Sequence, residues 1–191
     1  MIPSWNMAGL LPPIRPGMPG HSPDRSPYSA ILADVIDRFS TSPQLIDILQ
    51  GLLRLRAAFH AAGLVSGFQW VNGSFLEQVE ALEYRSPNDV DVVTYFDLPT
   101  GISEASLVAR APGIFDHDVV KATYQVDHYP AVLGKPTDAF QIRQISYWYS
   151  MWSHRRDGVW KGFIQVSLDP TEDILALQTL AAKGQHHDLS N

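Results

Sequence analysis

Two aspartates on one short apolar segment constrain this chain more than any other feature. Between residues 69 and 96 the sequence predicts a strand, a Gly-Ser turn, a short helix and a second strand that carries Asp89 and Asp91. Because side chains alternate along a strand, these two aspartates point to one face, while Val90 and Val92 point to the other, toward a core. Two carboxylates side by side on a buried strand repel each other and are costly to desolvate. The pattern therefore predicts a site for a divalent cation with hard oxygen ligands, Mg²⁺ or Mn²⁺.

The spacing of Gly73-Ser74 and the Asp89-x-Asp91 pair resembles the signature of the nucleotidyltransferase superfamily, the group with the DNA-polymerase-beta-like fold. The segments GLLPPIRPG and PNDVDVV are also similar to a bacterial group of nucleotidyltransferase-like proteins labelled as a domain of unknown function, and the resemblance covers most of the chain. Fourteen residues, 75–88, separate the two motifs, which is more than minimal members carry and predicts a longer helix or loop. The acidic residues of that segment are predicted to form a solvated face: Glu77, Glu80 and Glu83.

A third aspartate, Asp127, is predicted near the pair. It lies in the segment 123–129, which is rich in aromatic and β-branched residues and predicts a strand. The superfamily places a third carboxylate on a neighbouring strand, and Asp127 matches that position by order and context. The resemblance thus implies that Asp89 and Asp91 hold two Mg²⁺ ions and that Asp127 completes one metal site.

The resemblance also implies a reaction and a set of phosphate contacts. One metal ion would neutralise the triphosphate and stabilise the leaving pyrophosphate. The other, with Asp127 as base, would activate an acceptor hydroxyl for attack at the α-phosphate. Gly73, Ser74 and the backbone amides that follow would hold the β- and γ-phosphates.

A basic cluster lies at a predicted β-hairpin near the C-terminus. Strands are expected at residues 145–153 and 159–168, with an Asp-Gly turn between them. Three basic residues surround this turn: Arg155, Arg156 and Lys161. The cluster is either an exposed, charged hairpin tip or a phosphate-binding group that faces the carboxylates.

The pattern as a whole predicts an α+β fold of the nucleotidyltransferase-like kind, with a small mixed β-sheet flanked by helices, a C-terminal β-hairpin and a last helix. Residues 1–27, with seven prolines, form a proline-rich arm; residues 28–184 form one domain; and residues 185–191 form a flexible tail. Because the arm also carries apolar residues, we expect part of it to lie across the domain or a partner subunit. Helices are predicted at residues 29–39, 42–62, 103–110, 116–122 and 172–183.

Composition excludes several classes of protein. The 191 residues, 45% apolar and 18% charged, suit a single globular domain, and the absence of cysteine rules out disulfides and thiolate metal sites. The net charge of -6 argues against an extended surface for long nucleic acid. No apolar run is long enough for a membrane span, and the first residues do not read as a signal peptide, so a cytoplasmic location is the expectation.

Two functions of different classes follow from these features. The first is a metal-dependent enzyme that transfers a nucleoside monophosphate from a nucleoside triphosphate, with ATP as the first candidate, to a hydroxyl acceptor. The acceptor stays open among a protein hydroxyl, a tRNA end and a small molecule. The alternative is a non-catalytic nucleotide-binding protein or an antitoxin-type partner in a toxin–antitoxin or defence system. Its partner would be a second copy of the chain or the product of a neighbouring gene.

Overall fold

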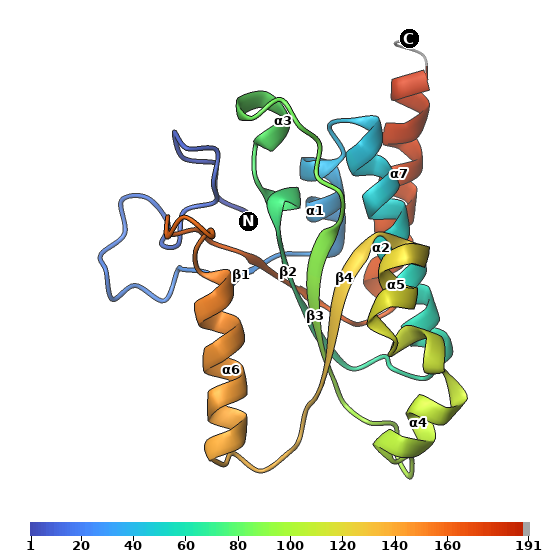
Figure 1. The fold of residues 1–191 in the computed structure, drawn as a ribbon. Coiled ribbons are helices and arrows are strands. Elements are labelled where there is room, and N and C mark those ends of the chain that lie inside the picture. The colour runs from blue at the N-terminus through green and yellow to red at the C-terminus, as the bar shows by residue number, and fades with distance from the viewer. Residues whose placement is uncertain (189–191) are drawn as a thin grey trace.

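A five-stranded mixed sheet forms the centre of the computed structural model, which describes residues 1–188 (Figure 1). The sheet has the order β1-β5-β2-β3-β4. Strand β2 is antiparallel to both of its neighbours, whereas β3 and β4 are parallel, as are β1 and β5. The strands are β1 (Tyr28–Ser29), β2 (Gly67–Asn72), β3 (Val90–Phe96), β4 (Val126–Val132) and β5 (Ile164–Ser167). The predicted small mixed sheet is therefore confirmed.

Helices lie on both sides of the sheet, so the predicted α+β class is also confirmed. Four of them, α1, α2, α5 and α7, gather on one side, and α6 stands on the other (Figure 1). None of the described helices is both long and apolar enough to span a membrane. The α-helices are α1 (Leu32–Phe39), α2 (Pro43–Ala61), α3 (Val79–Leu82), α4 (Glu104–Arg110), α5 (His117–Tyr124), α6 (Ala139–Trp152) and α7 (Thr171–Asp188). The 3-10 turns are η1 (Ser74–Leu76) and η2 (Pro112–Ile114).

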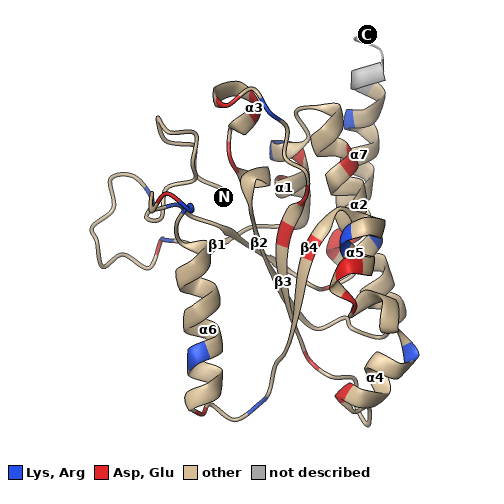
Figure 2. Cartoon of the chain, in the orientation of Figure 1, with Lys and Arg blue, Asp and Glu red and all other residues tan. Residues whose placement is uncertain are grey.

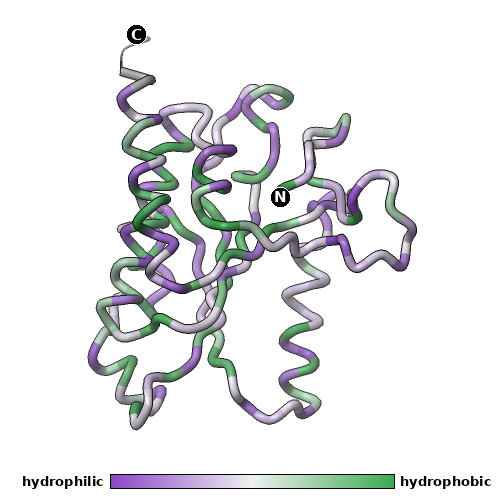
Figure 3. Tube along the Cα trace, turned by 180° about the vertical axis from the view of Figure 1, so that it is seen from behind, coloured by the Kyte–Doolittle hydropathy of each residue, from purple (hydrophilic) through white to green (hydrophobic). Residues whose placement is uncertain are grey.

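Helix α2 shows how local sequence signals set the element boundaries. The hydroxyl of Ser42 caps the helix by accepting a hydrogen bond from the Leu45 amide at 3.2 Å, and Pro43 occupies the first turn. Gly63, with φ of +86°, lies just beyond its end. The tube of α7, which packs against α2, alternates between hydrophobic and hydrophilic residues (Figure 3). Helices α1 and α2 bury most of their apolar residues in the core between helices and sheet.

The proline-rich arm is part of the domain. Leu10 and Leu11 are both buried, with 1% of their surface exposed. The Trp5 indole N–H donates to the Leu76 carbonyl at 2.7 Å, and the Gly162 amide donates to the Leu11 carbonyl at 2.7 Å. The expectation that the arm lies across the domain is confirmed, and the arm borders both η1 and the chain that leads into β5.

The predicted C-terminal hairpin is wrong. Residues 145–152, expected as its first strand, belong to helix α6, whose first amides are capped by Asp138. A tight turn does form at Asp157-Gly158, but a single bridge between His154 and Trp160 replaces the ladder. The aromatic content of this segment suits a strand, but its spacing allows Trp148 and Trp152 to lie one helical turn apart and pack on each other at 5.9 Å between ring centroids.

Two other boundaries differ from expectation. Helix α5 extends to Tyr124 and ends at Gln125, which has a left-handed φ of +56°, so β4 begins at Val126. Asp127 is therefore the second residue of its strand. Helix α7 runs to Asp188, beyond the expected end at residue 183, and residues 189–191 of the predicted tail lie outside the described residues.

A buried ion pair ties α2 to α7 and to the sheet. The guanidinium of Arg56, whose side chain is fully buried, donates to Asp173 at 3.0 Å through Nε and at 2.5 Å through a terminal nitrogen. It also donates to the side chain of Gln69 at 2.7 Å and to the carbonyl of Ser167 at 3.0 Å. Every one of these partners is needed, because a buried charge without counter-charge and hydrogen bonds is costly.

Removing the counter-charge should therefore weaken the fold. We expect Asp173→Asn to lower the free energy of unfolding by about 3 kcal/mol, since it leaves the Arg56 charge buried and uncompensated. The matched control is Asp37→Asn, which breaks the exposed pair with Lys183 between α1 and α7 and should change stability little. Urea denaturation at pH 7 measures both. Equal losses in the two variants would contradict the special role of Arg56.

Candidate functional site

Parallel pairing of β3 with β4 sets Asp91 directly opposite Asp127. Neighbouring strands lie about 4.8 Å apart, so the two carboxylates emerge side by side on one face of the sheet. Asp89 lies immediately before β3 rather than within it. The predicted convergence of the three aspartates is present in the structure, and Figure 2 shows acidic residues on β3 and β4 beside the mixed charges of α5.

Lys121 of α5 lies between two of these aspartates. Its ammonium is 2.9 Å from Asp89 Oδ2 and 2.7 Å from Asp127 Oδ2. Its hydrogen bonds to Asp127 and Asp89 raise the pKa of Lys121, so it is a fixed positive charge at neutral pH. One turn earlier on the same helix, His117 Nε2 lies 2.9 Å from Asp127 Oδ1. The hydrogen bond with Asp127 raises the pKa of His117.

Asp127 is held in its ionised form. Burial acts to raise the pKa of Asp127, but hydrogen bonds from Lys121, His117 and Tyr129 outweigh burial and hold that pKa below its usual range. Asp127 therefore offers a carboxylate, rather than a carboxylic acid, throughout the neutral pH range.

Asp91 is the least compensated of the three. Burial, together with repulsion from Asp89 and Asp127, raises the pKa of Asp91 to about 6. Among the described residues, no hydrogen bond or ion pair reaches its side chain. Gly73, with φ of +91°, lies against it: a Cβ at this glycine would be 2.8 Å from Asp91 Oδ2. Glycine at 73 thus gives room to the Asp91 carboxylate as well as to the turn.

Three basic side chains face the carboxylates across a cavity, and we call them the basic wall: Arg155, Arg156 and Lys161. Lys161 Nζ is 2.6 Å from Glu77 Oε1, and Arg155 is 2.8 Å from Glu83 Oε1 and 3.5 Å from Glu77 Oε2. The prediction that Glu77 belongs to a solvated face is wrong, because only 7% of its side chain is exposed. The physical reason is that α3 is a single turn, so η1 brings Glu77 inward to pair with the two cations.

The cavity, of about 770 Å³, collects every residue that the sequence marked as a candidate. It is lined by Gly73, Ser74, Asp89, Asp91, Asp127, Arg155, Arg156 and Lys161. Arg156 is exposed at its rim and, among the described residues, takes part in no ion pair. The basic cluster thus lines the same cavity as the carboxylates, and phosphate binding by it stays a prediction.

Four residues of the site were missed by sequence reasoning: Glu77, Lys121 and Tyr129, which line the cavity, and His117, which contacts Asp127. Two of them carried a signal. His117 and Lys121 have the spacing of four that places side chains on one face of a helix, and this helix directly precedes the strand of Asp127. Glu77 and Tyr129 carried none, since their positions depend on how distant segments pack.

The donor set suits a hard divalent cation, although the side chains are not arranged around one. No group of three or more histidine, aspartate or glutamate side chains in the described part of the chain is arranged to hold a metal ion, and Lys121 lies between Asp89 and Asp127. Carboxylate oxygens are nevertheless the type of ligand that Mg²⁺ and Mn²⁺ prefer, and Asp91 is repelled by both of its acidic neighbours. Lys121 would have to leave Asp89 and Asp127 for all three to bind one ion.

The fold and cavity define a class of protein: an α+β domain whose mixed sheet presents clustered carboxylates opposite a basic wall. Residues 3–167 match the sequence profile of a family of unknown function, DUF6932, and the chain belongs to that family. The match includes residues 3–27 of the arm and every residue that lines the cavity, among them the three aspartates. No curated protein and no solved structure matches the chain.

The raised pKa of Asp91 predicts a pH dependence of stability. A carboxyl group with a higher pKa in the folded than in the unfolded state stabilises the fold while it is protonated, and this contribution is lost as pH rises from about 4 through 6. At pH 7 we therefore expect Asp91→Asn to be more stable than wild type by about 1–3 kcal/mol, with the difference vanishing near pH 4.

Urea denaturation between pH 4 and 7.5, without divalent cations, measures this difference. Asp47→Asn, an exposed aspartate on α2, is the control and should follow the wild-type profile. An Asp91→Asn variant that is less stable than wild type at every pH would mean that the carboxylate supports the fold instead of straining it.

Proposed function

We propose that this protein binds a nucleoside triphosphate with Mg²⁺ or Mn²⁺ and transfers its nucleoside monophosphate to a hydroxyl acceptor. The observation that carries the proposal is the cavity in which Asp89, Asp91 and Asp127 face Arg155, Arg156 and Lys161. A triphosphate needs positive charge along its phosphates and a cation between it and any nearby carboxylates. Opposite walls of one cavity supply the positive charges and the carboxylates that these two requirements involve.

The nucleotide's phosphates would bind the basic wall and the Gly73-Ser74 turn. Arg156 is free to bind phosphate directly, whereas Arg155 and Lys161 would exchange part of their contact with Glu77 for it. Asp91, with Asp89 and Asp127, would hold the metal ion. Bound there, Mg²⁺ supplies charge neutralisation and polarises phosphate oxygens.

The chain's own part in transfer centres on Asp127. The acceptor oxygen forms a bond to the α-phosphorus, the bond from that phosphorus to the bridging oxygen of the β-phosphate breaks, and pyrophosphate leaves. Asp127, which is ionised at neutral pH and lies 2.9 Å from His117 Nε2, takes the hydroxyl proton of the acceptor. In the protein without a metal ion, Lys121 limits the repulsion between Asp89 and Asp127.

Nucleotide binding is the first test. The melting temperature should rise with millimolar ATP only when Mg²⁺ or Mn²⁺ is present, because a ligand of the native state stabilises it. Arg156→Ala should weaken ATP binding about tenfold or more, since it removes a charge-assisted phosphate contact, with little effect on stability. Arg143→Ala is the matched control, an exposed arginine of α6 outside the cavity. An unchanged melting temperature with each of the four nucleoside triphosphates would contradict the proposal.

Transfer is the second test. Asp127→Asn should reduce label transfer from α-labelled ATP by about 10²–10⁴, the usual effect of losing a general base, while ATP binding changes far less. Asp118→Asn is the control: Asp118 also contacts His117, at 3.1 Å, but is almost fully exposed. The assay supplies total tRNA, cell lysate and small alcohols as acceptors. Equal labelling by wild type and Asp127→Asn would remove Asp127 from its role.

A non-catalytic nucleotide-binding or antitoxin-type partner protein is the second candidate. It is favoured by one observation, that Lys121 already supplies counter-charge to Asp89 and Asp127. Under this alternative ATP binds, no acceptor is labelled, and Lys121→Met leaves transfer absent. Under the enzyme proposal, wild type transfers label with at least one class of acceptor.

A further inference from the structure

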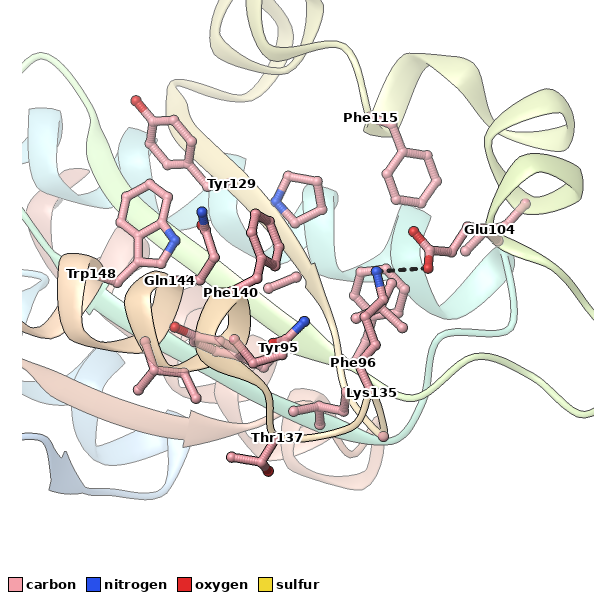
Figure 4. Close-up of a pocket in the computed structure, with 18 of the residues that line it drawn as sticks. Tyr95, Phe96, Glu104, Phe115, Tyr129, Lys135, Thr137, Phe140, Gln144 and Trp148 are labelled. Carbon is pink, nitrogen blue, oxygen red and sulfur yellow. Dashed lines mark ion pairs between the residues drawn. The ribbon is translucent and has the colours of Figure 1, made fainter.

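A second cavity, of about 630 Å³, lies between α6 and strands β3 and β4 (Figure 4). Its size is that of a site for a small organic molecule. Its walls are strongly aromatic, with Tyr95, Phe96, Phe115, Tyr129, Phe140 and Trp148. None of the residues that the sequence marked as candidates lines this cavity.

The two cavities lie along one face of the sheet. On β4, Asp127, Tyr129 and Ala131 alternate onto the same face, and their partners on β3 are Asp91, Val93 and Tyr95. Each step of two residues advances about 7 Å. The second cavity thus begins one step from the carboxylates, within the length of a small molecule.

Tyr129 joins the two cavities because it lines both. It is two residues from Asp127 on β4, on the same face of the strand, and its ring lies 4.6 Å from the ring of Trp148, measured between centroids. A molecule stacked along Tyr129 and Trp148 would therefore have one end at Asp127.

The Tyr95 hydroxyl is an unused polar group in the second cavity. Tyr95 is 7% exposed, and no hydrogen-bond partner for its hydroxyl is found among the described residues. A buried hydroxyl without a partner is costly, and a polar atom of a ligand would remove that cost. Gln144 of α6 adds an amide to the lining of the same cavity (Figure 4).

The cavity is electrically neutral. Among the lining residues, which all belong to the described part of the chain, the charged ones are Glu104 and Lys135, and they pair with each other at 2.8 Å (Figure 4). This environment does not suit the phosphates of a tRNA end. It suits an uncharged, largely apolar body with few polar atoms.

We propose that this cavity binds the acceptor of the transfer reaction, a small molecule with a flat aromatic body and hydroxyl groups at its two ends. One hydroxyl would bind Tyr95, and the other would reach Asp127 past Tyr129. The inference rests on the proposed function. The second hydroxyl oxygen bonds to the α-phosphorus of the nucleotide, its proton passes to Asp127, and pyrophosphate leaves, so that the product is a nucleoside monophosphate ester of the alcohol.

Binding is tested first, without nucleotide, with 2-(4-hydroxyphenyl)ethanol as the probe and 2-phenylethanol as its analogue lacking the ring hydroxyl. Ala131→Phe, which fills the cavity, should weaken binding of both by about tenfold or more. Tyr95→Phe should weaken binding of the probe about fivefold, which is the effect of one hydrogen bond. It should weaken binding of the analogue less than twofold. Ala181→Phe on the exposed side of α7 is the matched control and should bind as wild type.

Stability separates a binding role of Tyr95 from a structural one. Because its hydroxyl has no partner, Tyr95→Phe should keep or raise the melting temperature of the free protein. A lower melting temperature with unchanged probe binding would make the hydroxyl a support of the fold and overturn its assignment. This variant also keeps the inference testable if Ala131→Phe does not fold.

Transfer to the probe is tested with α-labelled ATP and Mg²⁺. Wild type should transfer label to 2-(4-hydroxyphenyl)ethanol. Ala131→Phe should transfer at least tenfold less label and still bind ATP with Mg²⁺. Probe binding without labelling, in a protein that binds ATP with Mg²⁺, would overturn the acceptor role. Failure of ATP binding in wild type would instead overturn the proposed function, and the acceptor role with it.

Two further outcomes would overturn the proposal. Failure of both compounds to bind wild type would overturn the small-molecule inference. Phe140 and Ile145 are 55% and 48% exposed on the open side of the cavity, so a second copy of the chain could also reach it. A dimer in size-exclusion chromatography that Ala131→Phe converts to a monomer would favour that occupant and overturn the proposal.

Discussion

The parallel pairing of β3 and β4 is the constraint on which the site depends. It fixes Asp91 and Asp127 in register, where neither can move away from the other without breaking the ladder. The repulsion is relieved unevenly: Asp127 receives Lys121 and His117 from α5, whereas Asp91 receives no such partner in the described part of the chain. The result is one carboxylate held ionised and one whose pKa is raised to about 6. Pairs of acidic groups pushed apart in this way are typical of functional sites.

The rest of the fold holds this pair of strands between two supports. On the side of α2, the Arg56 network reaches Gln69, which donates to Thr94 at 2.9 Å, and His128 Nε2 lies 2.9 Å from the same hydroxyl. Burial lowers the pKa of His128 to about 3, so it remains a neutral partner within the core. On the other side, the Asn72 amide donates to the Trp152 carbonyl at 3.1 Å and ties the end of α6 to β2 beside Asp91. Buried polar contacts thus hold these strands in place on both sides of the sheet, and the carboxylates face the cavity.

Local signals explain why much of this arrangement follows from the sequence. The alternation around Asp89 and Asp91, the Ser42-Pro43 cap of α2 and the aromatic strand of Asp127 each determine a local structure with few competing solutions. The segment of α6 is different, because aromatic residues favour a strand by propensity while its Asp138 cap and Trp148–Trp152 spacing favour a helix. Propensity and periodicity disagreed there, and packing of α6 against the sheet decided the outcome. Glu77 could not be predicted either, since its burial depends on Lys161 and Arg155, about eighty residues away in the chain.

The error at α6 matters for function, because a hairpin there would have left no second cavity. A helix standing off the sheet leaves space over the middle of β3 and β4, and the exposed fraction of Ile145 shows that its apolar face is only partly covered. Contiguous apolar surface left open in this way is typical of binding sites. Tyr129 makes that opening continuous with the carboxylate cluster, since one side chain contributes to both walls. The polar cavity and the aromatic cavity therefore adjoin at Tyr129, which is the arrangement that the proposed transfer between two substrates requires.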